Sequence, residues 1–319
     1  MAGGQERVLR RRIRSVESTK KITRAMELIA ASRIVKAQHA IAAARPYVEK
    51  MSEVVGHLAA SPDSAGHPVF RSSGETKSVA IVAITADRGL AGGYNANVIR
   101  AVERLAKEHT AASRQVRMVT VGRKATNYFR HRRADIMFSL TGKSDRPGYE
   151  DARNVVSAVV PAFEAGEVDR IDLVYTKFLS LGSQAVAVRQ LVPVAPGASD
   201  RGASDRGASG GPATAYEFEP EPTEILDRLL PSWLEAEVLA AMLESAASEH
   251  ASRQRAMKAA TDNADELIKT LRRIMNRARQ DSITSEIMEI VGGAEALRMV
   301  PGEDAGSYNE IYQPMSESA

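Results

Sequence analysis

Few side chains that could carry out catalysis stand at spacings that would bring them together. The chain has no cysteine, which excludes a thiolate nucleophile, a thiolate metal site and a disulfide. No serine lies in the sequence context of a nucleophile elbow. The histidines do not recur at the spacing of metal ligands; they are His39, His57, His67, His109, His131 and His250. We therefore expect no catalytic residue, no cofactor and no bound metal.

Three acidic side chains, Asp262, Asp265 and Glu266, stand close together in a segment with helical periodicity. Lys258 precedes Asp262 by four residues, and Lys269 follows Asp265 by four. Opposite charges at this spacing form ion pairs on the surface of a single helix. We interpret the acidic cluster as such a surface and not as a catalytic centre.

A glycine-containing turn at residues 86–93 lies between an apolar strand pattern and a helical pattern, where phosphate-binding loops occur. It matches neither common phosphate-loop motif, and it carries no lysine or hydroxyl group for a metal-bound phosphate. We predict a tight strand-to-helix turn whose glycines take positive φ. A nucleotide-dependent enzyme remains the alternative.

The elements that would position these residues begin with a long helix predicted over residues 224–297. Apolar or small residues recur there at alternating steps of three and four, the pattern of a coiled-coil seam; they are Met257, Ala260, Ala264, Leu267, Leu271, Ile274 and Ala278. His250 and Arg253 fall on or near this seam, where polar residues commonly set the register. Roughly 65–70 helical residues span on the order of 100 Å, so this helix needs a partner along its length.

A second long helix, predicted over residues 6–58, is that partner. Its apolar positions keep a similar rhythm; they are Ile22, Met26, Ile29, Ala37, Ala44, Val48, Met51, Val55 and Leu58. Two such helices at opposite ends of the chain pair most simply as an antiparallel rod. Alanine-rich seams bury little area, which suggests a rod that sits inside something else.

The middle of the chain predicts a compact α/β domain. Strands are expected at 78–86, 116–121, 171–178 and 185–191, and helices at 95–109, 124–130 and 149–164. Alternation of strands and helices favours a mostly parallel sheet. The short connection at 179–184 makes the last two strands an antiparallel hairpin.

The chain thus divides into segments of different character. We expect an N-terminal coiled-coil helix at 1–60, the α/β domain at 75–194, a disordered insertion at 195–222, a C-terminal coiled-coil helix at 223–297 and an acidic flexible tail at 298–319. The insertion repeats the sequence GASDR, which cannot bury enough surface to fold.

Basic residues concentrate in the two long helices. Twelve Lys and Arg residues stand against four acidic residues in positions 1–50, and a second cluster comprises Lys269, Arg272, Arg273, Arg277 and Arg279. A solvated helix face and a nucleic-acid surface are two interpretations. We favour a third, an acidic protein surface facing the rod. No run of about eighteen apolar residues occurs, so we expect a cytosolic or peripheral protein.

Four blocks in the expected order resemble the gamma subunit of F-type ATP synthases. They are residues 21–33 (KITRAMELIAASR), 87–93 (DRGLAGG), 257–263 (MKAATDN) and 278–294 (ARQDSITSEIMEIVGGA). The resemblance extends over most of the chain. Ala91 stands where that family often has cysteine, and Asp281 where it commonly has a small residue. The long insertion and tail are compatible with actinobacterial relatives.

The resemblance implies an α/β protein in which an antiparallel coiled coil of the terminal helices carries a Rossmann-like domain. It implies a non-catalytic central shaft that turns inside a hexamer of alpha and beta subunits and couples proton-driven rotation of the c-ring to ATP synthesis. The implied partners are the alpha and beta subunits, the epsilon subunit and the c-ring, with no nucleic acid. The implied location is the cytoplasmic face of the cell membrane, reached indirectly through the complex.

The same resemblance implies contacts with the alpha/beta hexamer. Six residues are candidates for them: Met26, Arg253, Arg279, Gln280, Thr284 and Glu286. Met26 matches a position near the foot of the hexamer, with Arg253 across the helix pair. An ordinary seam residue is an equally good interpretation of Met26.

Overall fold

The computed structural model describes residues 2–59, 69–70, 76–194, 219 and 221–299 of the 319-residue chain. Nearly all of the expected insertion and of the expected tail lies outside the described residues. By their internal contacts the residues form two compact units, one from residues 1–21 and 262–319 and the other from residues 22–261. Each unit is described below by itself.

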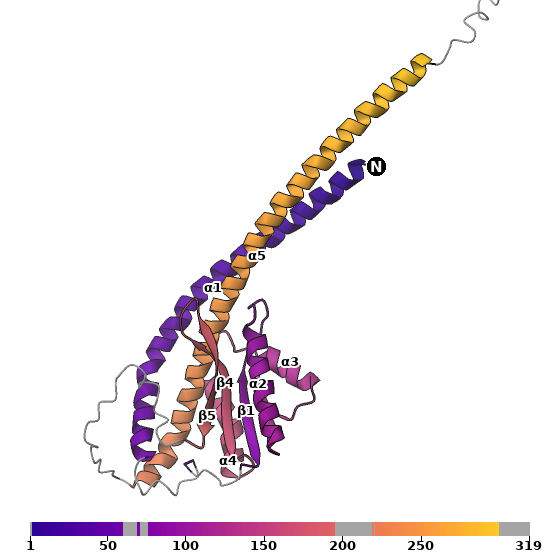
Figure 1. The fold of residues 1–319 in the computed structure, drawn as a ribbon. Coiled ribbons are helices and arrows are strands. Elements are labelled where there is room, and N and C mark those ends of the chain that lie inside the picture. The colour runs from indigo at the N-terminus through magenta and orange to yellow at the C-terminus, as the bar shows by residue number, and fades with distance from the viewer. Residues whose placement is uncertain (1, 60–68, 71–75, 195–218, 220, 300–319) are drawn as a thin grey trace, which may run out of the picture. The chain divides into compact units, whose positions relative to one another are not determined.

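Two long helices and a small sheet domain make up the described chain (Figure 1). The elements in order are α1 (Ala2–Ala59), β1 (Ser78–Ile84), α2 (Tyr94–Ala111), β2 (Gln115–Val121), α3 (Arg123–His131), β3 (Ile136–Leu140), α4 (Tyr149–Glu164), β4 (Arg170–Phe178), β5 (Gln184–Val192) and α5 (Pro222–Met299). Helices α1 and α5 each contribute to both units. No helix among the described residues combines the length and apolar character that crossing a membrane would need.

The sheet has five strands in the order β3-β2-β1-β4-β5. Strands β1 to β4 pair in parallel, and β4 and β5 form the predicted antiparallel hairpin. Every residue of β1 is buried, which is the reason for its uninterrupted apolar sequence. Strand β3 is absent from the sequence prediction because its five residues form a short, half-exposed edge strand with little alternation.

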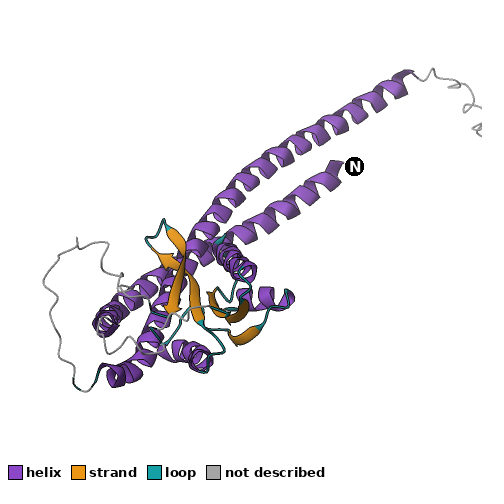
Figure 2. Ribbon diagram, turned by 60° about the horizontal axis from the view of Figure 1, so that its bottom comes forward, coloured by secondary structure: helices purple, strands orange, loops and turns teal. Residues whose placement is uncertain are grey.

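Helices cover both faces of the sheet (Figure 2). Val79, Ile81 and Ala83 of β1 pack toward α2 and α3. Ala80 and Val82, which point the other way, pack with α4 and with the segments of α1 and α5 that belong to this unit. The α/β domain therefore has two separate apolar layers.

A buried polar chain fastens α1, α5 and β5 together inside the larger unit. The Trp233 indole N–H donates to Ser52 Oγ at 3.1 Å, and Ser52 Oγ donates to Glu237 Oε1 at 2.9 Å. Arg189 of β5 forms an ion pair with the same Glu237 carboxylate. Because each of these groups has a partner, the bonds offset much of the free-energy cost of burying them.

The smaller unit is an antiparallel pair of helix segments. Ile268 and Leu271 of α5 are buried together with Ile13 of α1. Glu17 pairs with Arg272 at 2.7 Å and Lys20 pairs with Asp265, so residue numbers rise along one helix as they fall along the other. The Lys20–Asp265 pair also corrects the expectation that Asp265 pairs within its own helix.

At several positions of the seam, the buried residue is the neighbour of the residue that the sequence predicted. Leu267 and Ile274 are 41% and 47% exposed, while Ile268 and Leu271 are buried and Met275 packs against them. Ile22 and Ile29 of α1 are 59% and 53% exposed, and Thr23 and Ala30 take the buried places instead. Steps of three and of four residues fit the 3.6-residue helical repeat almost equally well. The sequence alone therefore could not decide which of two neighbouring residues faces the partner helix.

Candidate partner-contact surfaces

The last turns of α5 present a mixed polar and apolar surface. Arg279, Gln280, Thr284 and Glu286, which the sequence predicts as hexamer contacts, are all exposed on this one helix. At 3.6 residues per turn they lie on one side of it. The same side carries four exposed apolar residues that the sequence prediction missed: Ile283, Ile287, Ile290 and Val291.

Ile290 and Val291 are exposed where the partner helix has ended. Glu17 faces Arg272 in the antiparallel pair. Two paired helices rise by the same distance per residue. Ala2, the first residue of α1, precedes Glu17 by fifteen residues and therefore lies opposite about Ile287, fifteen residues after Arg272. Beyond that point α5 faces no residue of α1 that the structure describes. The unequal predicted lengths of the two helices were a signal for this overhang.

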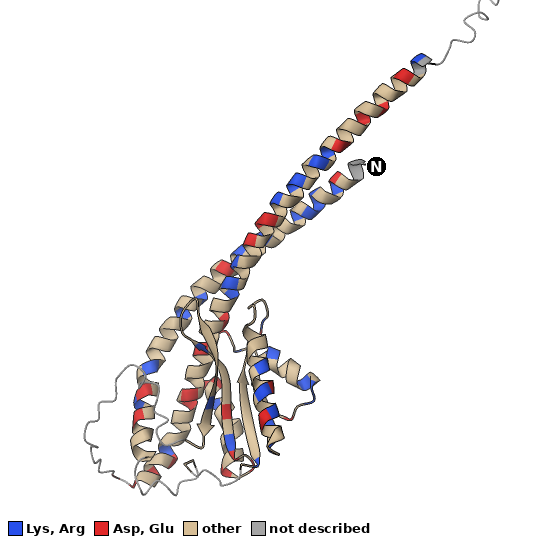
Figure 3. Cartoon of the chain, viewed as in Figure 1, with Lys and Arg blue, Asp and Glu red and all other residues tan. Residues whose placement is uncertain are grey.

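Lys and Arg residues are frequent on both paired helix segments next to the overhang (Figure 3). Residues 7–14 of α1 and 269–279 of α5 contain no acidic residue. Ten exposed cations lie in these two segments: Arg7, Arg10, Arg11, Arg12, Arg14, Lys269, Arg272, Arg273, Arg277 and Arg279. Arg10 and Arg272 pair with Glu6 and Glu17. We call these ten residues the basic collar; its charge attracts acidic surfaces and is screened by salt over about 8 Å.

Met26 and Arg253, the other two predicted contacts, belong to the larger unit. Met26 is half-buried on α1. Arg253 is only 7% exposed, and its guanidinium donates to Glu249 Oε1 at 2.6 Å and to the Gly89 carbonyl oxygen at 3.3 Å. Within the chain, Arg253 thus links α5 to the turn after β1. Its contact with another subunit stays a prediction.

The turn after β1 is built around the carboxylate of Asp87. That carboxylate accepts backbone N–H bonds from Gly142 at 2.8 Å, Ser144 at 3.0 Å and Arg123, the first residue of α3, at 3.0 Å. Burial raises the pKa of Asp87, but these bonds outweigh it and hold the pKa below its usual value. The Asp87 carboxylate therefore ties the turn to the loop after β3 and to the start of α3.

The backbone of this turn differs in part from the prediction that its glycines take positive φ. Gly92 does so, with φ +56°, but Gly93 has φ −79° and Leu90 takes φ +62°. The tight point lies elsewhere, at Gly122, where a Cβ atom would stand 2.1 Å from the Thr85 carbonyl oxygen. Only glycine fits that close approach between the ends of β1 and β2.

The ionisable residues of the domain interior form structural pairs. His109 lies 3.2 Å from the Asp172 carboxylate, which also accepts from Arg170 at 2.9 Å. Both His109 and Asp172 are buried. Among the residues that the structure describes, no three His, Asp or Glu side chains gather where a metal ion could be held.

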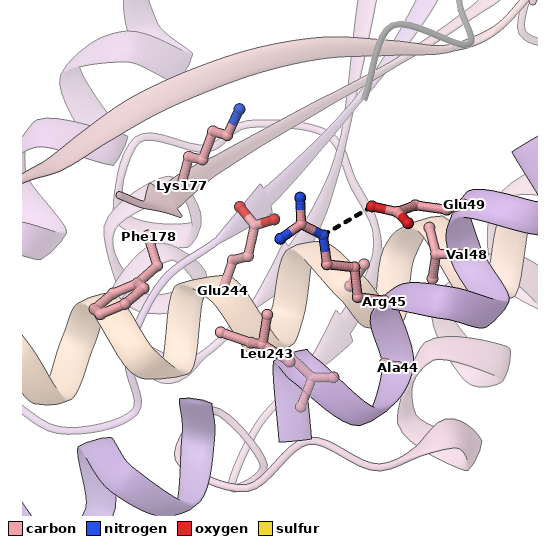
Figure 4. A pocket seen from close by; sticks show the side chains of 10 residues that line it. Ala44, Arg45, Val48, Glu49, Lys177, Phe178, Leu243 and Glu244 are labelled. Atoms are coloured by element: carbon pink, nitrogen blue, oxygen red, sulfur yellow. Dashed lines mark hydrogen bonds and ion pairs between the residues drawn. The ribbon is translucent and has the colours of Figure 1, made fainter. Parts of the chain in front are cut away.

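A small cavity of about 180 Å³ lies between α1, the end of β4 and α5 (Figure 4). An Arg45–Glu49 ion pair of 2.8 Å lies at its edge. The cavity has two cations and two carboxylates among its lining residues, so it offers no net charge to a ligand; the charged residues are Arg45, Lys177, Glu49 and Glu244.

The chain thus combines an antiparallel pair of terminal helix segments with a mixed-sheet α/β domain, and its relatives define the class of protein. The family model described as ATP synthase matches residues 5–297. The chain is 49% identical over 298 residues to an ATP synthase gamma chain of Frankia casuarinae, covering 92% of this chain and 98% of that one. It is 45% identical to that of Acidothermus cellulolyticus, over 92% and 98%. The chain belongs to the ATP synthase gamma chain family.

Solved structures show the same fold. A chain of the Euglena gracilis mitochondrial ATP synthase has a TM-score of 0.65 at 17% identity, covering 96% of this chain and 99% of that one. A chain of the Tetrahymena thermophila mitochondrial enzyme, from its central stalk and c-ring, has a TM-score of 0.55 at 24% identity, over 75% and 99%. At these identities the likeness concerns the fold alone.

Proposed function

We propose that this chain is the central rotary shaft of a proton-driven F-type ATP synthase. The observation that carries the proposal is the antiparallel pairing of two terminal helices of 58 and 78 residues in a chain of the gamma family. The shaft itself is not catalytic. It couples rotation of the membrane c-ring to conformational change at the catalytic sites of the alpha/beta hexamer.

The geometry suits the transmission of torque. A continuous helix of 78 residues is about 115 Å long at 1.5 Å per residue. Long continuous helices resist twisting better than domains joined by flexible loops. Because the two helices differ in length and in surface, the shaft is asymmetric and presents a different side to each catalytic site.

The finer assignment concerns which surface meets which partner. The overhang of α5 and the turn before it, with Ile283, Ile287, Ile290 and Val291 exposed, suit an apolar bearing formed by the alpha and beta subunits. Arg279, Gln280, Thr284 and Glu286 supply polar contacts beside it. The basic collar suits acidic loops of the hexamer, which it can contact without deep interlocking. The epsilon subunit and the c-ring complete the proposed partners, with the complex at the cytoplasmic face of the cell membrane.

Affinity purification of the tagged chain tests the assignment. We expect two larger nucleotide-binding subunits to copurify in stoichiometric amounts, and Arg279→Ala or Gln280→Ala to lower the coupled ATPase turnover of the complex. Arg228→Ala is the matched control, because it removes an exposed arginine that pairs with Glu224 within the other part of α5. Absence of those subunits contradicts the shaft, whereas unchanged turnover in both variants contradicts only the two contacts.

A further inference from the structure

Two loops at the carboxyl ends of the parallel strands are joined into one body. They are residues 85–93 after β1 and residues 141–148 after β3. The Asp87 carboxylate binds the Gly142 and Ser144 amides, and the Asp87 N–H donates to Ser144 Oγ at 2.8 Å. Asn95 Oδ1 accepts from the Ala86 N–H at 2.9 Å and holds the first loop to α2. We call these two loops the loop clamp.

The loop clamp is hydrogen-bonded to α5 through His250 and Arg253, which lie about one turn apart on that helix. Arg253 donates to the Gly89 carbonyl oxygen at 3.3 Å and to Glu249 at 2.6 Å. His250, only 1% exposed, donates from Nε2 to the Asp145 carbonyl oxygen at 3.3 Å. Ala256 Cβ lies 3.8 Å from where a Cβ of Gly92 would stand. These contacts connect both loops to one side of α5.

The clamp also reaches the other long helix. Arg33 of α1 donates to Asp145 Oδ2 at 2.6 Å, and both side chains are less than a third exposed. Asp145 thus meets α5 through its carbonyl oxygen and α1 through its carboxylate. These directional bonds add to the apolar packing and fix the position of the loops along the two helices.

We propose that the loop clamp transmits torque between the α/β domain and helices α1 and α5, with Asp87, Asp145 and Arg33 as its positioning residues. The inference rests on the proposed function of the chain as a shaft. It assigns a mechanical role to the Asp87–Gly93 turn, whose position at the carboxyl ends of the strands is otherwise that of a ligand-binding loop. Asp87 joins the two loops to each other, and Asp145 joins them to α5 through its carbonyl oxygen. Arg33 binds the Asp145 carboxylate and so joins the loops to α1.

The test compares ATP synthesis with ATP hydrolysis in complexes that contain variant chains. Inverted membrane vesicles report synthesis driven by a proton gradient, and the detached catalytic part reports hydrolysis. Arg33→Ala and Asp145→Ala are expected to lower the ratio of synthesis to hydrolysis about fivefold, as loss of a charge-assisted bond between the moving parts allows slippage. Arg45→Ala, which removes an arginine–carboxylate pair of 2.8 Å within α1 alone, leaves the ratio unchanged.

A charge exchange separates torque transmission from a general loss of structure. Arg33→Asp combined with Asp145→Arg restores the pair in reverse and is expected to recover the ratio to within about twofold of the parent chain. An unchanged ratio in both single variants overturns the proposal, and so does a lowered ratio that the exchange fails to recover. These outcomes concern variant chains that still copurify with the complex, so they test the loop clamp alone. Failure of the parent chain to copurify would instead contradict the proposed function as a shaft.

Discussion

The two units of this protein contrast in how much of their apolar surface is buried. In the larger unit the sheet domain holds two apolar layers, and β1 is buried along its whole length. In the smaller unit the buried apolar residues that the structure describes are Ile13, Ile268, Leu271 and Ala264, while Ile283, Ile287, Ile290 and Val291 are exposed. The larger unit thus buries an extensive apolar core, whereas the smaller unit leaves much of its apolar surface exposed.

The contrast extends to charge. Arg253, Glu249 and Glu237 in the larger unit are buried and paired within the chain. Most arginines of the basic collar point into solvent. Paired charges in the interior specify one packing, whereas unpaired surface charges are available for association. The predictions below test this contrast, from the largest expected effect to the smallest.

Truncation of Trp233 should have the largest effect on stability. Trp233→Ala removes a buried side chain from the main apolar layer and its hydrogen bond to Ser52, so we expect a loss of about 3–5 kcal/mol in the free energy of unfolding. Urea denaturation followed by circular dichroism measures it. Met288→Ala, at an exposed position of α5, should change the same quantity by less than about 0.5 kcal/mol. Equal losses in the two variants would contradict the contrast.

Two leucines four residues apart test the corrected seam. Leu271 is buried against Ile13 and Ile268, whereas Leu267 is largely exposed. Leu271→Ala should destabilise the helix pair by about 2–3 kcal/mol and Leu267→Ala by less than about 1 kcal/mol. Thermal unfolding of the helical signal of the full chain distinguishes them. If Leu267→Ala proved the more harmful, the seam would lie where the sequence placed it.

Asp87 tests whether the turn after β1 depends on a charge. Asp87→Asn keeps the shape but weakens three charge-assisted backbone bonds, so we expect a loss of about 1–2 kcal/mol in unfolding free energy. Asp281→Asn on the exposed surface of α5 is the matched control. Because the folded-state pKa of Asp87 is lowered, its stabilising contribution is complete above its unfolded pKa and disappears as the pH falls through the folded pKa. A variant as stable as the control at pH 7 would contradict this role.

The smallest expected effect is a pH dependence caused by His250. Burial lowers the pKa of His250 to about 4 in the folded chain. The unfolded chain therefore binds a proton on this histidine near pH 6.5, whereas the folded chain binds it only near pH 4. Stability therefore falls as the pH drops through this window. Burial also raises the pKa of the neighbouring Glu249, which acts in the opposite direction.

His250→Gln isolates the histidine contribution. The variant should lose about 1 kcal/mol less stability than the parent chain between pH 7 and pH 5.5. Chemical denaturation at the two pH values gives the comparison, with His39→Gln on exposed α1 surface as control. Parallel losses in His250→Gln and the parent chain would show that the histidine does not titrate in this window.

Much of the architecture could be predicted because it depends on local patterns. The β1 run is continuously apolar, the helix of α4 was predicted at its observed bounds, and the β4–β5 hairpin follows from a connection too short for a crossover. Strand β3 was missed because five residues at a sheet edge carry too weak a pattern. The four family blocks identified the gamma family independently of these patterns.

What the sequence determined by itself is the list of elements, the pairing of the two terminal helices and the family, because each depends on short-range periodicity or on residue identity. The tertiary structure alone decided which seam residue faces inward, that Arg253 bonds to Gly89, and that Asp87 and Asp145 join two loops to two helices. Those contacts connect residues far apart in the chain. Which residues form these contacts depends on how the elements pack, and no local sequence pattern predicts that packing.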